Sequence, residues 1–307
     1  MYSLARRIQK VTIYSFHSTT NMGLFDRFKS NKNTALPKGA HLLTIQNVQK
    51  LTPQAVQLTF DVPTALSDKF NFTPGQYLTL ALDIDGEQLR RSYSICSSSS
   101  AGLSIGVKAI ANGKASNFLQ NIKAGEEVIV FEPEGNFTWN PNNKNVVAIA
   151  AGSGITPIIS ILKTILREEP LSTVTLFYGN KGMNEIIFRE ELEALKNKYL
   201  DRMNLVHIFS RENIGVPLLK GRIDAARIPL LLQAFVNNQT IDGAYICGPQ
   251  EMILAVKDEL IAFGLAANLI HFELFHAAPV VRTNQNNEAK VAAFESHIEL
   301  IMDGEVT

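Results

Sequence analysis

Residues 145–166 read N-V-V-A-I-A-A-G-S-G-I-T-P-I-I-S-I-L-K-T-I-L. The run 146–151 is short, apolar and rich in β-branched side chains, which predicts a strand buried on both faces. Glycines in the G-S-G of residues 152–154 allow a sharp turn, and Pro157 suits the first turn of a helix whose apolar spacing continues through 158–165. A strand, a glycine turn and a helix start together predict a phosphate-binding site. Taken alone, they are also compatible with an ordinary tight turn.

Composition limits the possible classes of protein. With 307 residues, 46% hydrophobic and 19% charged, the chain is long enough for two soluble domains. A formal net charge of +0 disfavours a nucleic-acid partner, and no apolar run is long enough to span a membrane. Cys96 and Cys247 provide no disulfide framework, so we expect a reducing, cytoplasmic compartment. The six histidines have no metal-ligand spacing, so no metal site is predicted.

Residues 1–38 differ from the remainder because they hold seven Lys or Arg and one acid, Asp26. A basic, hydroxyl-rich start is typical of a transit peptide. We favour an upstream start codon with Met22 as the true initiator, because composition is all that supports targeting. In either case this basic N-terminal extension is excluded from the predicted fold.

Residues 39–142 are predicted to form a β domain. Turn residues separate short alternating runs at 42–48, 55–60, 77–82, 103–107 and 127–131. One short helix is expected at 116–121. Strands at this spacing without long helices indicate an antiparallel barrel or sandwich.

Residues 143–275 change to an alternation of strands and helices. Strand-like runs occur at 146–150, 174–178, 205–209, 244–247 and 269–274, and helical runs at 157–167, 185–199, 225–234 and 250–263. This order predicts an α/β doubly wound parallel sheet, whose ligands bind at the carboxyl ends of the strands. The predicted fold is therefore an antiparallel β-barrel domain followed by an α/β nucleotide domain.

Three further motifs accompany the glycine turn: R-R-S-Y-S-I at 90–95, G-K-A-S at 113–116 and C-G-P at 247–249. In this order the motifs resemble the ferredoxin–NADP reductase superfamily of flavoproteins, over roughly residues 41–275. The resemblance implies that the barrel binds FAD and that the α/β domain binds a nicotinamide nucleotide.

The resemblance assigns Arg91 to the flavin phosphates, Tyr93 to the flavin ring and Ser94 to its reactive nitrogen. A guanidinium offers a planar set of donors that suits a pyrophosphate. Taken singly, Arg91 could be a surface ion-pair residue and Tyr93 a core aromatic; the R-x-Y-S spacing favours the flavin role. The implied flavin-binding residues are Arg91, Tyr93, Ser94, Ile95, Val107, Lys108, Gly113, Lys114, Ala115, Ser116 and Phe275.

The resemblance places Thr156 near the nicotinamide ring and assigns catalytic roles to Ser94, Cys247 and Glu273. Cys247 could equally be a small buried apolar residue. The implied nucleotide-binding residues are Gly152, Ser153, Gly154, Thr156, Pro157, Ser210, Arg211, Cys247, Gly248 and Pro249.

Arg211 decides the predicted choice of nucleotide. Ser210 and Arg211 follow the third strand and suit a 2′-phosphate, so NADPH is predicted, unless Arg211 is a solvated loop residue. The glycine turn lacks a third glycine, and no acid follows the run 174–178, which disfavours an NAD dehydrogenase of the Rossmann type.

Residues 276–307 contain a polar linker at 282–288, a strand-like run at 297–302 and an Asp303-Gly304 pair typical of a hairpin turn. This layout resembles the reductase components of multicomponent oxygenases, in which a plant-type [2Fe–2S] domain follows the nucleotide domain. We expect a linker and the start of a truncated ferredoxin-like domain. The four ligating cysteines are absent, so the [2Fe–2S] cluster is expected only in a longer form.

The predicted function is a flavin-dependent NAD(P)H oxidoreductase that passes electrons from NADPH through FAD to an iron–sulfur or oxygenase acceptor. A free-standing ferredoxin or flavodoxin reductase and a flavohaemoglobin-like reductase are the alternatives within the enzyme class. A catalytically inactive nucleotide-binding regulatory module is the alternative from another class.

Overall fold

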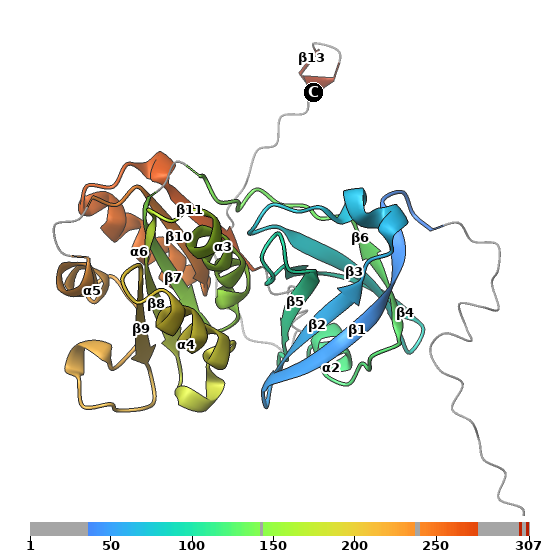
Figure 1. The fold of residues 1–307 in the computed structure, drawn as a ribbon, viewed down its shortest axis with the longest axis horizontal. Helices are drawn as coiled ribbons and strands as arrows, with labels where there is room; N and C mark the ends of the chain where they lie inside the picture. The colour runs from blue at the N-terminus through green and yellow to red at the C-terminus, as the bar shows by residue number, and fades with distance from the viewer. Residues whose placement is uncertain (1–35, 142–143, 237–239, 276–300, 303–304, 307) are drawn as a thin grey trace, which may run out of the picture. The chain divides into compact units, whose positions relative to one another are not determined.

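The structure is a computed structural model that describes residues 36–141, 144–236 and 240–275, together with 301–302 and 305–306 (Figure 1). The described residues up to Phe275 belong to one compact unit, and the described residues after it belong to a second. None of the described helices is long and apolar enough to cross a membrane.

The first part of the first unit is an antiparallel sheet with the strand order β4-β3-β6-β1-β2-β5. Its strands are β1 (Ala40–Thr52), β2 (Ala55–Asp61), β3 (Tyr77–Ile84), β4 (Glu87–Ser94), β5 (Leu103–Lys108) and β6 (Glu127–Phe131). Alternate residues of β3, namely Leu78, Leu80 and Leu82, are buried, as expected for a strand with one face on a core. Ile95, directly after β4, forms an antiparallel bridge with Ile105 of β5, so the sheet curls until its two edges meet. The predicted antiparallel barrel is confirmed.

Two helical segments interrupt the barrel. The α-helix α2 (Lys114–Leu119) begins two residues before the helix expected at 116–121. The 3₁₀ helix η1 (Thr64–Phe70) was not predicted. It follows Pro63 and buries only Phe70, so it carries no repeating apolar stripe that a sequence pattern could reveal.

The second part of the first unit is a parallel sheet with the order β11-β10-β7-β8-β9. Its strands are β7 (Asn145–Ala151), β8 (Thr173–Asn180), β9 (Met203–Phe209), β10 (Gly243–Gly248) and β11 (Ile270–Leu274), and its helices are α3 (Ile155–Glu168), α4 (Arg189–Lys198), α5 (Ile228–Phe235) and α6 (Gln250–Ala262). The central strand β7 is buried on both faces: Ala148 packs in one core with α3 and α4, and Ile149 packs in another with α5 and α6 (Figure 1). The predicted doubly wound domain is confirmed.

Helix α3 is more deeply buried than an amphipathic pattern predicts, since Ile159, Ser160 and Thr164 are buried as well as the expected apolar stripe. One of its sides packs on the parallel sheet. The barrel residues Ala55 and Cys96 belong to the same buried cluster as α3. The helix is therefore enclosed by both sheets of the first unit.

The helix expected at 185–199 begins later, at Arg189. Phe188 precedes it with a left-handed backbone (φ 61°), and Ile186, Ile187 and Phe188 are buried as a separate segment. The helix expected at 225–234 begins at Ile228, where Pro229 occupies the first turn, a position that favours proline.

In the second unit, β12 (Ile301–Met302) and β13 (Glu305–Val306) pair in antiparallel fashion on either side of residues 303–304. The hairpin turn expected at Asp303-Gly304 falls on two residues outside the described ones. The expected linker at 282–288 and residues 1–35 of the N-terminal extension also lie outside the described residues.

Candidate nucleotide and flavin site

A pocket of about 600 Å³ lies at the carboxyl ends of β7, β8, β9 and β10. Ser153 follows β7, Lys181 follows β8, Arg211 follows β9 and Pro249 follows β10, and all four line the pocket. This is the position at which open α/β sheets bind ligands, and the volume is in the range of small-molecule sites.

The glycine turn is held tightly against the end of β10. A Cβ atom on Gly154 would lie 2.1 Å from the carbonyl oxygen of Cys247, so no other residue fits there. The Tyr178 hydroxyl donates a hydrogen bond to the Gly152 carbonyl oxygen at 3.0 Å. Burial raises the pKa of Tyr178, which keeps this hydroxyl protonated and able to donate.

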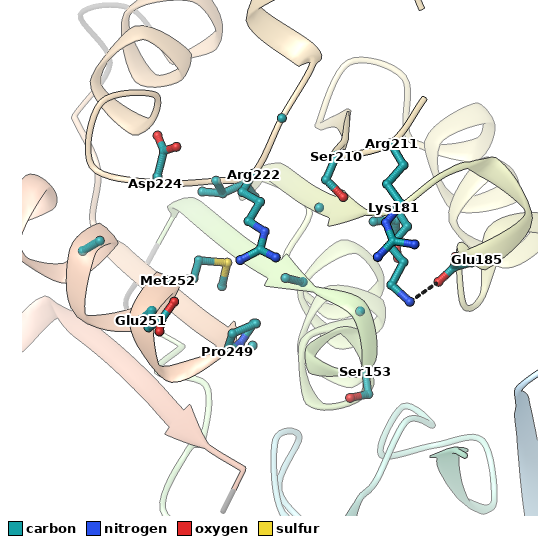
Figure 2. Close-up of a pocket in the computed structure, with 18 of the residues that line it drawn as sticks. Ser153, Lys181, Glu185, Ser210, Arg211, Arg222, Asp224, Pro249, Glu251 and Met252 are labelled. Atoms are coloured by element: carbon teal, nitrogen blue, oxygen red, sulfur yellow. Dashed lines mark ion pairs between the residues drawn. The ribbon is translucent and has the colours of Figure 1, made fainter. Parts of the chain in front are cut away.

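Basic side chains dominate one part of the pocket. Figure 2 shows the guanidinium groups of Arg211 and Arg222 extending into the same space, with Lys181 beside Arg211. Lys181 Nζ lies 3.6 Å from Glu185 Oε2. Within the described ranges, neither Arg211 nor Arg222 forms a salt bridge, so both are available to an anion.

Arg222 is held in place by the loop that precedes it. The Arg227 guanidinium donates hydrogen bonds to the carbonyl oxygens of Leu218 (3.0 Å) and Lys220. Lys220 also forms a parallel bridge with Phe209, the last residue of β9. The loop is therefore fixed to the sheet edge, which directs Arg222 over the pocket.

The three residues expected to be catalytic lie together, where the barrel meets the parallel sheet. Ser94 Oγ donates a hydrogen bond to Glu273 Oε2 at 3.2 Å. Cys247 is the direct neighbour of Glu273 across the β10–β11 pair. Burial raises the pKa of Glu273 to about 7, although the Ser94 hydrogen bond lowers it. Burial, followed by the charge of Glu273, raises the pKa of the Cys247 thiol, so the thiol stays protonated.

The expected flavin residues on β4 have two different environments. Arg91 and Tyr93 share one face of the strand by its two-residue period. Arg91 is exposed and donates to the Arg90 carbonyl oxygen at 2.7 Å, which leaves most of its donors available. Tyr93 packs partly on the barrel core, and burial raises the pKa of its hydroxyl to about 12.

The G-K-A-S segment lies beside β4, because Lys114 forms an ion pair with Glu87 at the start of that strand. Ser116 Oγ accepts a hydrogen bond from the Ile110 amide at 3.1 Å and donates to the Gly113 carbonyl oxygen at 3.2 Å. These two bonds fix the loop that enters α2. The G-K-A-S segment is thus linked to the start of the strand that carries the R-R-S-Y-S-I motif.

Several expected site residues do not present side chains to either site. Ile95, Val107 and Ala115 are buried in the barrel core. Thr156 and Pro157 are buried at the start of α3, and the Thr156 hydroxyl donates to the Ser153 carbonyl oxygen at 2.9 Å. The side chains of these residues are enclosed by protein in the structure.

Lys108 and Phe275 were expected at the flavin, and both line the pocket at the strand ends of the parallel sheet. Lys108 Nζ is 3.6 Å from the position that a Cβ on Gly152 would take, and burial lowers the pKa of the ammonium. Lys108 therefore connects the end of β5 with the glycine turn. Ser210, Gly248 and Pro249 line the pocket as expected.

Sequence reasoning missed Lys181 and Arg222. Lys181 directly follows β8, and the rule that ligands bind at the carboxyl ends of parallel strands could have identified it. Arg222 follows no predicted strand, and only the folded loop brings it to the pocket.

Two family models match this chain: an oxidoreductase FAD-binding domain over residues 42–139 and an oxidoreductase NAD-binding domain over residues 148–258. The chain belongs to the ferredoxin–NADP reductase family of FAD- and NAD-binding oxidoreductases.

Curated relatives include a subunit of the 1,2-phenylacetyl-CoA epoxidase of Escherichia coli (strain K12), with 42% identity over 77% of this chain and 68% of the relative. The ferredoxin reductase component of 3-ketosteroid-9-alpha-monooxygenase from Mycolicibacterium smegmatis is 35% identical over 78% of this chain and 67% of its own.

Among solved structures, a ferredoxin NADP+ reductase from Neisseria gonorrhoeae with bound FAD and NADP superposes with a TM-score of 0.64 and 23% identity. The match covers 77% of this chain and 99% of that one, and at this identity it supports the fold alone.

Proposed function

We propose that this chain is an NADPH-dependent flavoprotein reductase that passes electrons from NADPH through FAD to an iron–sulfur centre, as the reductase component of a multicomponent oxygenase. The contact between Ser94 and Glu273 carries the proposal, because it joins the end of the flavin strand to the nucleotide-binding sheet. When bound, FAD supplies the redox chemistry, taking two electrons from the reduced nicotinamide and releasing them one at a time. The protein residues bind, orient and adjust protonation.

The residues present suit both groups. On the barrel, the exposed Arg91 guanidinium and the Lys114 ammonium offer donors to a diphosphate, and Tyr93 offers an aromatic face. In the pocket, Ser153 and the backbone of the glycine turn begin a helix, which favours a phosphate.

At the junction of the two sites, Glu273 is suited to hold or release a proton near neutral pH, because burial raises its pKa to about 7. The Ser94 hydroxyl can donate either to Glu273 or to a flavin atom. The neutral Cys247 thiol closes the site without adding charge. When the charge of a bound flavin changes, Glu273 could gain or lose a proton to compensate for it. No uncompensated charge would then remain buried at the junction.

We infer a preference for NADPH over NADH from Arg211, Arg222 and Lys181. A bidentate guanidinium on a phosphate dianion is a strong and specific interaction. The competing candidate, NADH, is supported by the carboxylates Asp224 and Glu251 in the same pocket, either of which could accept a hydrogen bond from a ribose hydroxyl.

The names of two relatives, a subunit of phenylacetyl-CoA epoxidase and a ferredoxin reductase component of a monooxygenase, support an oxygenase as the acceptor. We assign the role of reductase component in a phenylacetyl-CoA epoxidase type of system, in the cytoplasm. The two cysteines, both buried, are too few for a [2Fe–2S] cluster, so the cluster must come from a longer form or a partner.

Steady-state turnover of the FAD-loaded chain with ferricyanide as acceptor tests this function. The proposal predicts turnover with NADPH, a larger kcat/KM for NADPH than for NADH, and no electron transfer to an oxygenase unless a [2Fe–2S] protein is added. Absence of turnover with both nucleotides would support the inactive regulatory module instead.

A further inference from the structure

Lys163 of α3 is a buried lysine with three partners. Its side chain is only 12% exposed. The Nζ atom donates a hydrogen bond to the Cys96 carbonyl oxygen at 2.8 Å, lies 2.7 Å from Glu191 Oε1, and sits 5.6 Å from the centre of the Phe188 ring. A lysine is rarely buried to this extent without compensation, and here the acceptors and the ring provide it.

The acceptor of this bond belongs to the barrel. Cys96 follows the flavin strand β4 by two residues, and its amide donates to the Ser104 carbonyl oxygen at 2.9 Å. The neighbouring Ile95 makes the bridge that closes the barrel. The Cys96 carbonyl thus lies two residues along the chain from Ser94, beside the bridge that closes the barrel.

The donor belongs to the nucleotide-binding part. Lys163 lies about two helical turns after Thr156, on the helix that begins at the glycine turn. A second bond runs in parallel, from Ser160 Oγ to the Ser97 carbonyl oxygen at 2.6 Å. Both acceptors are backbone atoms, so the connection fixes the course of the chain after β4 rather than one side chain.

The start of α3 meets the barrel at a second place. A Cβ atom on Gly106 of β5 would lie 2.5 Å from Thr156 Cγ2 and 3.2 Å from the Phe188 ring, so the two parts are in close contact there. Phe188 holds a left-handed backbone at φ 61°, which is unfavourable for an aromatic residue. It also directly precedes α4, the helix that carries Glu191 to Lys163.

We propose that Lys163 is a positioning residue for flavin reduction, because its ammonium sets the distance between the end of the flavin strand and the glycine turn that holds the nucleotide. The inference rests on the proposed function. Transfer between two bound rings is steeply sensitive to their separation, and a displacement on the order of 1 Å can cost about a hundredfold in rate.

The test compares Lys163→Met, which keeps the length of the apolar stem, with Lys163→Arg, which keeps the charge and the donors. Stopped-flow bleaching of the flavin by NADPH gives a limiting rate and a half-saturating concentration. We expect Lys163→Met to lower the limiting rate by about tenfold, with half-saturation and FAD content within about twofold of wild type. Lys163→Arg should recover most of the loss. Ser160→Ala, a milder change that keeps the helix intact, should lower the rate by about threefold.

A second readout needs no flavin. Cys96 is fully buried at the junction. In the flavin-free chain, Lys163→Met should increase hydrogen–deuterium exchange of the backbone around Cys96, whose amide donates to the Ser104 carbonyl oxygen, by about tenfold, while the backbone around Cys247 exchanges at the wild-type rate, as resolved by peptide mass spectrometry. Val256→Ala, in the core on the opposite side of the sheet, is the control for lost stability. It should lower the melting temperature without either effect.

The proposal is overturned if Lys163→Met and Ser160→Ala reduce the flavin at the wild-type limiting rate, or if Val256→Ala slows it equally. It is also overturned if Lys163→Arg recovers nothing. If neither NADPH nor NADH reduces the flavin of the wild-type chain, the proposed function is contradicted, and this inference with it. If NADPH reduces the wild-type flavin and the variants show the same limiting rate, this inference alone is contradicted.

Discussion

The Ser94 hydroxyl at the end of β4 donates a hydrogen bond to Oε2 of Glu273 in β11 at 3.2 Å, across 179 positions of sequence. β4 carries Arg91 and Tyr93, and β11 lies beside the strand that carries Cys247. This single bond therefore joins the flavin-binding and nucleotide-binding parts of the chain.

The buried carboxyl of Glu273 should reduce stability above neutral pH. The pKa of Glu273 is about 7 in the folded chain, and the unfolded chain has the ordinary value of 4.5. Below about pH 4 the carboxyl is therefore protonated in both the folded and the unfolded chain. Between these values the unfolded chain loses the proton first, and stability falls as the pH rises. Glu273→Gln should thus raise stability by on the order of 2 kcal/mol at about pH 8 and have little effect near pH 4. Urea unfolding at the two pH values measures the change in the free energy of unfolding. An equal change at both pH values would contradict the raised pKa of Glu273.

Cys247→Ala should slow reduction of the flavin by NADPH by about tenfold, because the thiol closes the site where the nicotinamide must approach. FAD content should stay at the wild-type level, since the flavin motifs lie on the barrel. Ile246→Val, at the next position of β10 and in the opposite core, controls for lost packing. Stopped-flow bleaching separates the two variants; if they behave alike, Cys247 only fills space.

Arg91→Ala should weaken FAD binding by about 1.5–3 kcal/mol, or roughly ten- to a hundredfold, through loss of charged hydrogen bonds. The neighbouring Arg90 is a matched control, because its guanidinium packs over the Phe131 ring at 4.7 Å. Arg90→Ala should leave the affinity nearly unchanged. Fluorescence titration of the flavin-free chain measures both constants, and equal losses would remove Arg91 from the flavin site.

Arg211→Ala should lower kcat/KM for NADPH by about tenfold or more and leave the value for NADH nearly unchanged. Arg222→Ala should have a smaller effect in the same direction. Arg189→Ala, which removes an exposed arginine paired with Glu193 on α4, provides the control. The assignment to NADPH would be wrong if the wild-type chain had a larger kcat/KM for NADH and Arg211→Ala changed neither value.

The elements that depend on local patterns could be predicted from the sequence. The β7 strand, the glycine turn and α3 follow from an apolar run, two glycines and a helical spacing within one short stretch. The start of α4 could not be predicted, because buried contacts hold Phe188 in a left-handed backbone that its sequence does not favour. The bridge between Ile95 and Ile105 depends on the whole barrel closing.

In the site too, some residues carry a local sequence signal and others are positioned only by tertiary packing. The family resemblance pointed to Ser94, Cys247 and Glu273, and the structure places them together. The position of Lys108 beside the glycine turn depends on how the barrel packs on the parallel sheet, and that packing leaves no local sequence signal. The contact of Lys163 could not be predicted for the same reason, because its acceptor, the Cys96 carbonyl oxygen, lies in the barrel.

We propose that one chain binds both FAD and NADPH so that electrons pass between them. The most direct test loads the purified chain with FAD, removes oxygen and titrates NADPH while the visible flavin absorbance is recorded. The account predicts complete bleaching at one equivalent of NADPH per bound FAD, with no iron present. A chain that retains no FAD, or one whose bound FAD keeps its colour in excess NADPH and NADH, would contradict it.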